Sequence, residues 1–377
     1  MKILHITPSY KPAYIYAGPV ESVARLCEGL AEAGHEVHVY TTTANGDIEL
    51  DVPAGVEQDV SGVRVTYFKR VTKDPTNMSP DLWRQLMTCG QEFDAVHIHS
   101  WWNFCVLVAA WICHFKRIRI IVSPRGMLSE YIFRSTNPNK KRWLHTLLGR
   151  RALAKAVFHA TASAEYEECV KLIPGWKGFL LPNILLLPEI NIRKEPNEVF
   201  TLIYLSRIHP KKGLELLLES MTNLPFDVQL KIAGSGDDRY VESLKKLIDK
   251  LKLTQKVRWL GWKSREEKFV ELMNSDSFVL TSYNENFANV VIEALHVGTP
   301  VLISEEVGLS PFVSENNLGW VTALNVESIR NTIIQAYQDT ERRLSVNQQG
   351  RSVINEAFSQ THLIAKYVEH YNLVNTG

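Results

Sequence analysis

The chain has 377 residues, of which 45% are hydrophobic and 22% charged, and this composition excludes a disordered or fibrous protein. Lys and Arg number 42 against 41 Asp and Glu, and the resulting net charge of +1 excludes a nucleic-acid-binding polycation. The five cysteines form no CxxC motif. They therefore favour a reducing, cytoplasmic compartment over a disulfide framework or a zinc site.

The start of the chain predicts a buried strand. Met1–Ser9 lacks a charged leader followed by a long apolar region, so we expect no signal peptide. The longest apolar run, Phe104–Cys113, has ten residues. A membrane-spanning helix needs about 20 apolar residues, so we expect no transmembrane helix.

The first half of the chain alternates short apolar runs with amphipathic stretches. Lys2–Thr7 predicts a strand, and Gly18 and Pro19 open a helix whose apolar stripe ends at Ala31. This β-α-β order predicts a parallel sheet with helices on both faces. Further strands are predicted near residues 37–39 and at residues 95–98, 118–122 and 157–160.

A second run of the same kind begins at Phe200, after a stretch broken by Pro182, Pro188 and Pro196. We therefore expect two α/β domains, residues 1–185 and 186–358. A last helix, residues 359–377, either closes the second domain or returns to the first. The second run predicts strands at residues 200–206, 228–233, 257–260, 278–281 and 300–303, and helices at residues 213–221 and 239–252.

Two loops of the second half have the chemistry of phosphate sites. Ligands of open parallel sheets bind beyond the carboxyl ends of the strands. After one strand, Arg207 and Lys212 precede a helix, where cations and helix N–H groups suit a diphosphate; a solvated basic turn is the alternative. After the next strand, Gly234 and Gly236 allow a ligand to approach closely, or form a plain tight turn. The third glycine of a dinucleotide fingerprint is missing, so a dehydrogenase is disfavoured.

The most informative stretch runs from Asn284 to Leu295. A helix starting near Asn289 would present free N–H groups to an anion. Glu285 precedes this helix and Glu293 lies one turn inside it, where carboxylates can accept hydrogen bonds from sugar hydroxyls. Two carboxylates around an anion-binding helix start indicate a nucleotide sugar. A capped helix with one buried and one exposed glutamate is the alternative.

Taken together, three motifs resemble the retaining GT-B glycosyltransferases known as glycosyl transferases group 1, or glycosyltransferase family 4, including bacterial surface-polysaccharide transferases. The resemblance covers nearly the whole chain. It implies an α/β GT-B fold, two Rossmann-like domains whose parallel sheets face each other across a cleft. The N-terminal domain would bind the acceptor and the C-terminal domain the nucleotide sugar. The motifs are Arg207-x4-Lys212, Gly234-x-Gly236, and Glu285-x7-Glu293 followed by Gly298-Thr299-Pro300.

The same resemblance implies a role for individual residues. Arg207 and Lys212 would hold the diphosphate, Glu293 the ribose hydroxyls and Glu285 the donor sugar, while Trp262 would flank the base. The implied catalytic residues are His99, Arg125, Arg207, Lys212 and Glu285. The implied nucleotide-sugar-binding residues are Gly18, Arg207, Lys212, Gly234, Gly236, Trp262, Glu285, Asn286, Phe287, Ala288, Asn289, Val290 and Glu293.

The implied reaction is a retaining, metal-independent transfer of a sugar from a nucleotide sugar to a saccharide hydroxyl. Fixed cations and helix-end amides would stabilise the negative charge that develops on the leaving diphosphate, so neither a cofactor nor a metal is expected. The donor would be UDP- or GDP-linked, and the acceptor lipid-linked, in polysaccharide or glycolipid biosynthesis. A nucleotide-sugar epimerase of related fold and a non-catalytic nucleotide-sugar-binding protein are the alternatives.

Three segments depart from the family pattern. Gly18 stands between Ala17 and Pro19 where many members have paired glycines, which weakens the expected contacts of this loop. Arg125 stands near a family histidine and could bond the donor sugar or a charged acceptor. His99 is then the better histidine candidate, with a purely structural histidine as the alternative. The family usually has glycine where this chain has Asn286 and Ala288. Alanine tolerates positive φ poorly, so Ala288 tests whether the loop needs that conformation.

Positive charge gathers between Ala95 and Ala164, where Glu130 is the one acidic residue. Trp143, Leu144, Leu147 and Leu148 lie among the basic residues. The segment predicts peripheral binding to anionic lipid on the inner face of the cytoplasmic membrane. A basic helix whose apolar side lies in the core is the alternative. The basic residues are Lys116, Arg117, Arg119, Arg125, Arg134, Lys140, Lys141, Arg142, Arg150, Arg151 and Lys155.

Overall fold

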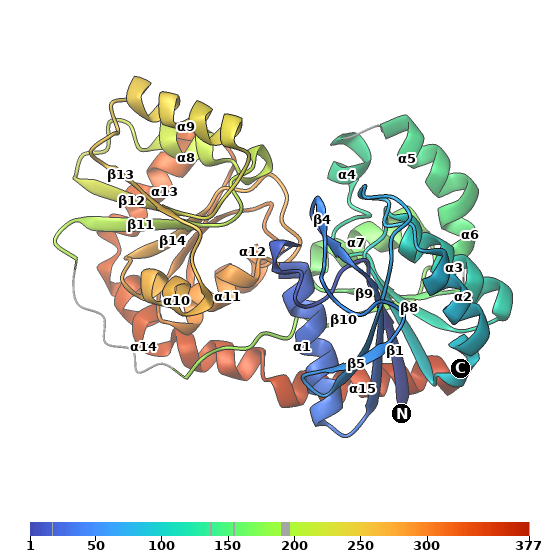
Figure 1. Ribbon diagram of the computed structural model, residues 1–377. Coiled ribbons are helices and arrows are strands. Elements are labelled where there is room, and N and C mark those ends of the chain that lie inside the picture. The colour runs from blue at the N-terminus through green and yellow to red at the C-terminus, as the bar shows by residue number, and fades with distance from the viewer. Residues whose placement is uncertain (17, 136–137, 154, 190–196, 377) are drawn as a thin grey trace. The chain divides into compact units, whose positions relative to one another are not determined.

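The computed structural model describes residues 1–16, 18–135, 138–153, 155–189 and 197–376 (Figure 1). The chain folds into two compact units. Unit 1 comprises Met1–Leu186 and Phe358–Gly377, and unit 2 comprises Leu187–Ala357. Pro182 lies in unit 1 and Pro188 in unit 2, whereas Pro196 and Ala17 lie outside the described residues.

Among the described residues of unit 1, eight strands form one sheet in the order β10-β9-β8-β7-β1-β2-β6-β5. All neighbours in this sheet pair in parallel except β5 and β6. A short hairpin, β3 with β4, lies outside it. The strands are β1 (Lys2–Ile6), β2 (Glu36–Thr42), β3 (Ala44–Asn45), β4 (Ile48–Glu49), β5 (Glu57–Val60), β6 (Val63–Phe68), β7 (Ala95–His99), β8 (Ile120–Ser123), β9 (Val157–Ala160) and β10 (Gly178–Leu180).

Helices form most of the crossovers between the parallel strands of unit 1, whereas β2 reaches its parallel neighbour β6 through β3, β4 and β5. Several begin with standard signals: Asn103 caps α3 by accepting a hydrogen bond from the Val106 N–H, and Pro80 opens α2. The helices are α1 (Gly18–Glu32), α2 (Pro80–Cys89), α3 (Phe104–Lys116), α4 (Glu130–Ser135), α5 (Pro138–Leu144), α6 (Arg150–Leu153), α7 (Ser163–Leu172) and α15 (Gln360–Thr376). Single turns are η1 (Tyr14–Tyr16), η2 (Gly90–Glu92) and the π-helical η3 (His145–Gly149).

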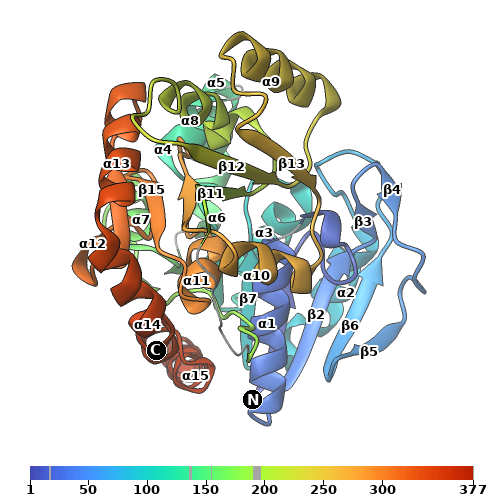
Figure 2. The same cartoon turned by 90° about the vertical axis from the view of Figure 1, so that its left-hand side faces the viewer.

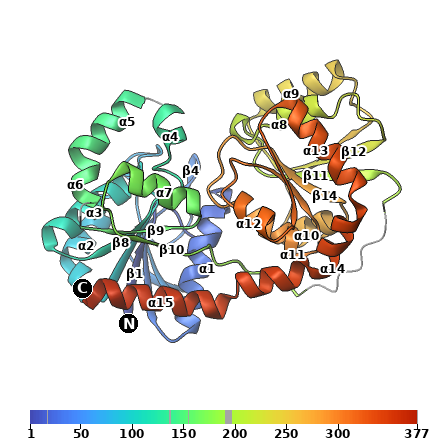
Figure 3. The same cartoon turned by 180° about the vertical axis from the view of Figure 1, so that it is seen from behind.

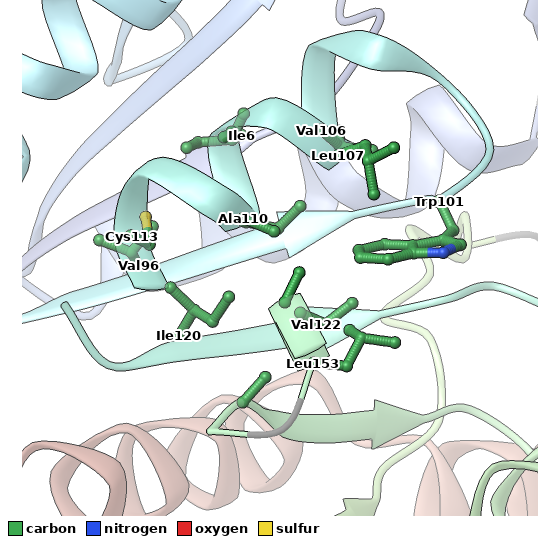
Figure 4. Packing of buried hydrophobic residues seen from close by; sticks show 14 of the residues in the cluster. Ile6, Val96, Trp101, Val106, Leu107, Ala110, Cys113, Ile120, Val122 and Leu153 are labelled. Atoms are coloured by element: carbon green, nitrogen blue, oxygen red, sulfur yellow. The ribbon is translucent and has the colours of Figure 1, made fainter. Parts of the chain in front are cut away.

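Helix α3 forms one wall of the core of unit 1. Its buried Val106, Ala110 and Cys113 face Val96 on β7 and Val122 on β8 (Figure 4). Small side chains on α3 bring the helix close to the strands. Burying one Val or Leu side chain stabilises the fold by about 1.5–3 kcal/mol, so this wall contributes to the stability of unit 1 around β7 and β8.

In unit 2, six described strands form a wholly parallel sheet in the order β13-β12-β11-β14-β15-β16. Helices α8 and α9 cover one face, and α10 and α11 the other (Figure 2). The strands are β11 (Phe200–Leu205), β12 (Val228–Ala233), β13 (Val257–Gly261), β14 (Ser277–Leu280), β15 (Val301–Ser304) and β16 (Gly319–Thr322). The helices are η4 (Pro210–Lys212), α8 (Leu214–Ser220), α9 (Asp238–Lys250), α10 (Arg265–Met273), α11 (Asn289–His296), α12 (Ser310–Glu315), α13 (Val326–Gln338) and α14 (Thr340–Ala357).

The C-terminal helix α15 packs on unit 1, along its sheet and beside α1 (Figure 3). A Cβ atom on Gly29 of α1 would lie 2.7 Å from Ile364 Cδ1, so the two helices pack closely at this glycine. The Arg119 guanidinium donates to the backbone oxygens of Val374 and Asn375, both at 3.1 Å. These contacts fix the end of the chain to the first unit.

The structure differs from the sequence analysis mainly at the sheet edges. The sequence pattern does not predict β5, β6, β10 and β16. Three of them are only three or four residues long, which leaves little periodicity to detect. Strand β6 is longer, but its pattern of one buried, one exposed and four buried residues lacks regular alternation. By contrast, β9 and β12 coincide with the predicted ranges.

Candidate active site

The basic loop of unit 2 begins where β11 ends. Arg207 is exposed, whereas Lys212 is buried, with 9% of its surface accessible. Gly213 follows at φ +64°, and a Cβ there would lie 2.1 Å from the Thr281 carbonyl oxygen, so only glycine fits. Burial and the charges of Arg207, Lys211 and Lys212 lower the pKa of His209, which indicates a positive potential in this loop.

The end of β14 holds the basic loop in place. Thr281 Oγ1 donates to the Gly213 oxygen at 2.9 Å, and Ser282 Oγ donates to the Lys211 oxygen at 3.1 Å. The Lys212 ammonium then forms an ion pair with the Glu285 carboxylate. The backbone of Glu285 is held on both sides, by the Glu306 oxygen at 3.0 Å and the Gly308 N–H at 2.8 Å. Residues 73 positions apart thus meet at the carboxyl ends of neighbouring strands.

Helix α11 starts directly after this ion pair. Ala288 is its N-terminal cap and adopts φ +63° and ψ 72°, the left-handed conformation. The loop therefore does require positive φ at this position. Asn286 is half-buried, Phe287 is buried and anchors the turn, and Asn289 and Val290 open the helix. The first N–H groups of α11 thus follow the ion pair closely in sequence and have the polarity that suits an anion.

Glu293 lies inside α11 with 6% of its surface accessible. Lys268 on α10 donates to Glu293 Oε1 at 2.6 Å. Sequence reasoning missed Lys268. The available signal was the capping box of Ser264 and Glu267, which starts α10 and so places Lys268 on the next turn of that helix.

The glycine turn after β12 packs against the basic loop. Cβ atoms on Gly234 and Gly236 would lie 1.9 Å from the Ser206 oxygen and 2.1 Å from the Ile208 oxygen. Both glycines thus permit backbone contact between two loops of the site. Trp262, at the end of β13, exposes 70% of its surface, and no described contact ties it to the Lys212–Glu285 pair.

A second cluster of predicted residues lies in unit 1. Arg125 follows β8 at φ +53°, and its Nη1 donates to Ser22 Oγ at 3.0 Å. Ser22 Oγ donates in turn to the Gly18 oxygen at 2.9 Å. Arg125 Nη2 lies 3.4 Å from His99 Nδ1. Gly18, His99 and Arg125, far apart in sequence, are therefore gathered at one place in unit 1.

Next to His99, a series of hydrogen bonds crosses the sheet of unit 1. The sequence analysis did not predict it. His159 Nε2 must donate to the Leu181 carbonyl oxygen at 2.8 Å, so its Nδ1 accepts from Ser123 Oγ at 2.6 Å. Ser123 Oγ then accepts from His97 Nε2 at 2.6 Å, and His97 Nδ1 accepts from the Tyr371 hydroxyl at 2.8 Å. Every link is satisfied with both imidazoles neutral. Polar residues within buried strands were the available signal.

His5, His97 and His99 bring ligand nitrogens within 4.8 Å of one another, which is close enough for a metal ion. Hydrogen bonds already account for both nitrogens of His97, and His5 Nδ1 lies 2.9 Å from His99 Nε2. The Arg125 guanidinium beside His99 opposes a further positive charge. The residues present therefore fit a neutral hydrogen-bonded cluster better than a metal centre.

A mixed basic and apolar surface extends over α5, η3 and α6 of unit 1. Trp143 exposes 65% of its surface, and Leu147 and Leu148 are also exposed. Arg142, Arg150 and Arg151 are exposed on the same elements, and we call these six residues the α5–α6 surface. Lys141 instead donates to the Ile132 oxygen at 3.0 Å, and the side chain of Lys140 lies outside the described residues. Within the described part of the chain, no helix is long and apolar enough to cross a membrane.

Sequence comparison decides the family. The family described as "Glycosyl transferases group 1" matches residues 188–353, and the family described as "Glycosyl transferase 4-like domain" matches residues 17–180. The chain matches glycosyl transferase families over most of its length, one in each unit. It is thus a glycosyltransferase, as the three motifs of unit 2 indicated.

Individual relatives agree with this family. An uncharacterized glycosyltransferase of Methanocaldococcus jannaschii is 26% identical over 99% of this chain and 98% of its own length. The lipopolysaccharide 1,2-N-acetylglucosaminetransferase of Salmonella typhimurium is 27% identical over 55% of this chain and 58% of its own. The second match thus spans little more than half of either protein.

Solved structures show the fold. Sucrose-phosphate synthase from Thermosynechococcus elongatus superimposes with a TM-score of 0.76 at 17% identity, covering 99% of each chain. Anabaena HepE in complex with UDP and glucose superimposes with a TM-score of 0.75 at 18% identity, again covering 99% of each. The predicted α/β GT-B fold is confirmed.

Proposed function

We propose that this glycosyltransferase transfers a sugar, with retention and without a metal, from a nucleotide sugar to a saccharide hydroxyl. The observation that carries the proposal is the Lys212–Glu285 ion pair, which stands at the carboxyl ends of β11 and β14 and directly before α11. Unit 2 would bind the donor and unit 1 the acceptor, in line with the predicted domains, residues 1–185 and 186–358, with the last helix, residues 359–377, on the acceptor side.

The leaving diphosphate needs positive charge, and the basic loop of unit 2 supplies it. Lys212 is nearly buried, so its charge acts in a medium of lower dielectric constant than water and interacts more strongly. Arg207 is exposed and offers a planar fork of donors suited to a phosphate. The N–H groups at the start of α11 add polarity of the same sign. Removing one such preorganised donor typically lowers turnover by about 10²–10³-fold.

The two glutamates would bind the two ends of the donor. We assign Glu285, which is ion-paired with Lys212, to the sugar linked to the diphosphate, because its carboxylate can accept hydrogen bonds from the sugar hydroxyls. Glu293 lies one turn inside α11, and Lys268 orients its carboxylate. We assign Glu293 to the ribose hydroxyls, since a buried carboxylate held by a fixed partner is a selective acceptor.

Retention follows if the acceptor hydroxyl attacks from the face that the leaving group vacates. The glycosyl–phosphate bond breaks as the new glycosidic bond forms. A diphosphate oxygen takes the proton of the hydroxyl, and no separate base is required. Lys212 and Arg207 stabilise the charge that accumulates on the diphosphate.

The proposed acceptor is supported by a surface of unit 1 and by the similar proteins. A lipopolysaccharide transferase is among the similar proteins, which supports a saccharide acceptor on a lipid carrier. The α5–α6 surface would hold the enzyme against anionic lipid at the inner face of the cytoplasmic membrane. The UDP complex of the HepE neighbour supports a nucleotide-sugar donor, with UDP and GDP as the first candidates.

Calorimetric titration with UDP, GDP and ADP, in EDTA and again in Mg²⁺, tests the proposal. We expect one diphosphate to bind equally well in both buffers. Glu293→Gln should weaken it by about 10–150-fold, because a hydrogen bond to a charged group contributes about 1.5–3 kcal/mol. Glu242→Gln, at an exposed position of α9, is the control and should bind as the parent chain does. Absence of binding to all three diphosphates, or an unchanged affinity in Glu293→Gln, would refute the proposal.

A further inference from the structure

Arg125 is a largely buried cation without a negative partner among the residues that the structure describes. Its Nη1 donates to Ser22 Oγ at 3.0 Å and to Asn183 Oδ1 at 3.1 Å, and its Nη2 lies 3.4 Å from His99 Nδ1. All three partners are neutral. Its Nε is buried and has no hydrogen-bond partner within the described part of the chain. A guanidinium has five N–H donors, so two of them remain unused.

The nearby carboxylates are engaged with other groups. Glu165 Oε1 accepts from the Gly126 N–H at 2.6 Å, and its Oε2 accepts from the Thr161 N–H at 2.9 Å. Glu28 forms ion pairs with Lys11 and Arg25. Burial lowers the pKa of Arg125 and the Glu165 charge opposes this shift, but neither carboxylate forms an ion pair with Arg125 in the described structure. A positive charge in this position is costly to bury without a counter-ion.

The histidines around Arg125 cannot balance its charge. His99 stacks on His5 with ring centroids 5.2 Å apart, and its Nδ1 faces the guanidinium. Burial lowers the pKa of His5 to about 3, and the Arg125 charge acts in the same direction, so the cluster remains neutral. Arg125 is therefore the one positive charge in this hydrogen-bonded cluster of described residues.

The position of Arg125 is that of a ligand-binding residue. It lies in the loop at the carboxyl end of β8, the edge at which open parallel sheets bind ligands. Its backbone adopts φ +53°, which is unfavourable for an arginine, and the next residue, Gly126, donates its N–H to Glu165. Part of its surface remains exposed to solvent. A strained, partly exposed cation that has unused donors and no ion pair in the described structure indicates an anion that binds there.

We propose that Arg125 anchors an anion-binding subsite in unit 1 that takes a carboxylate or phosphate group of the acceptor. The proposal rests on the proposed function, because it assumes that unit 1 binds the acceptor. The planar guanidinium suits either group, since both offer two oxygens to a pair of N–H donors. The acceptor is thus an acidic saccharide, such as a uronic acid or a sugar phosphate.

Binding of three matched probes to the full chain tests this subsite. Glucuronate, glucose 6-phosphate and glucose are titrated at constant ionic strength into the parent chain, Arg125→Gln and Arg125→Lys. We expect at least one acidic sugar to bind the parent chain tenfold or more tightly than glucose, and the two acidic probes separate a carboxylate from a phosphate subsite. Arg125→Gln should lose the preference, and Arg125→Lys should keep only part of it. Equal affinities in the parent chain, or an intact preference in Arg125→Gln, would overturn the proposal.

Two further measurements distinguish a defect in this subsite from a defect in the donor site or in folding. Arg125→Gln should bind the nucleoside diphosphate as the parent chain does, which shows that unit 2 is folded and its site intact. Its Tm should stay equal or rise, because a buried charge without a partner has been removed. A lower Tm with an unchanged acid preference would give Arg125 a structural role instead. If the parent chain binds no diphosphate but still prefers an acidic sugar, the proposed donor site of unit 2 is refuted and the Arg125 subsite is not.

Discussion

At the scale of the single residue, Ala288 shows that the chain tolerates strain at its proposed donor site. The N-terminal cap of α11 requires a left-handed conformation, and alanine adopts it at a cost of about 1–2 kcal/mol relative to glycine. The loop is held by the Glu285 backbone bonds to Glu306 and Gly308 and by the buried Phe287. Tertiary contacts therefore impose a backbone angle that the residue itself disfavours.

Relief of this strain is measurable as stability. Ala288→Gly should raise the free energy of unfolding of unit 2 by about 1 kcal/mol, or its Tm by about 2–4 °C. The matched control is Ala294→Gly, the same substitution at a helical position of α11, which should lower stability by about 1 kcal/mol. Scanning calorimetry of the two variants and the parent chain shows whether each substitution raises or lowers Tm. A Tm that falls in both variants would contradict the strain at Ala288.

At the scale of the element, α15 and three strands of unit 1 form one polar network inside an apolar core. The Tyr371 hydroxyl donates a hydrogen bond to His97 Nδ1 on β7, and the Tyr367 hydroxyl lies 3.0 Å from His159 Nε2. Burial lowers the pKa of His159 to about 3. The helix thus closes a network whose histidines stay neutral, and its position on unit 1 depends on hydrogen bonds as well as on apolar contact.

The buried histidines of unit 1 predict how its stability depends on pH. The pKa of His5 and His159 is about 3 in the folded chain and about 6.5 in the unfolded chain. Between these values the unfolded chain binds protons that the folded chain does not, so the free energy of unfolding decreases as the pH falls from 6.5 towards 3. Each such histidine contributes a slope of at most about 1.4 kcal/mol per pH unit. The pKa of His97 and His99 is likewise lowered by burial, and both add to the same trend.

Urea unfolding of unit 1 at a series of pH values from about 7.5 to about 4.5 measures this slope. His5→Asn should reduce it by about 1.4 kcal/mol per pH unit, because one titrating group is removed. His362→Asn, at an exposed position on α15, serves as the control and should leave the slope as it is. If His5→Asn and the parent chain show the same slope, His5 is not buried as a neutral group.

At the scale of the whole molecule, charge is distributed unevenly although its sum is close to zero. The α5–α6 surface combines three exposed arginines with the exposed Trp143, Leu147 and Leu148. Arginine and tryptophan together are typical of a surface that rests on an anionic membrane, the cation at the headgroups and the indole at the interface. Lys141 contributes to folding instead, through its bond to Ile132.

Charge reversal tests this surface. Replacing Arg142, Arg150 and Arg151 by Glu should weaken co-sedimentation with phosphatidylglycerol vesicles at least about 100-fold, because each cation contributes about 1 kcal/mol near anionic lipid. Trp143→Ser should weaken it further. The control reverses Lys245, Lys246 and Lys250 on α9, which changes the net charge equally on another unit. Equal binding of the parent chain and the arginine variant would place any membrane contact elsewhere.

Much of the architecture follows from local pattern alone. The parallel strands around β1, β7 and β11 are short apolar runs, and burial on both faces explains why their patterns are continuous. The position of Arg207, Lys212 and Glu285 after predicted strands indicated ligand-binding loops, because parallel sheets bind ligands there, and the resemblance of their motifs to a known family indicated the family. The short edge strands escape prediction because they carry too little periodicity.

The sequence by itself thus determined the fold class, the family and the loops in which the proposed donor-binding residues lie, since these depend on residues close together in the chain. Only the tertiary structure decided the pairings. It joined Lys212 to Glu285 and Glu293 to Lys268, brought Tyr371 onto His97, and left Arg125 without a counter-ion among the described residues. Such contacts depend on strand order and helix packing, which bring residues tens to hundreds of positions apart within hydrogen-bond distance. No local pattern encodes them.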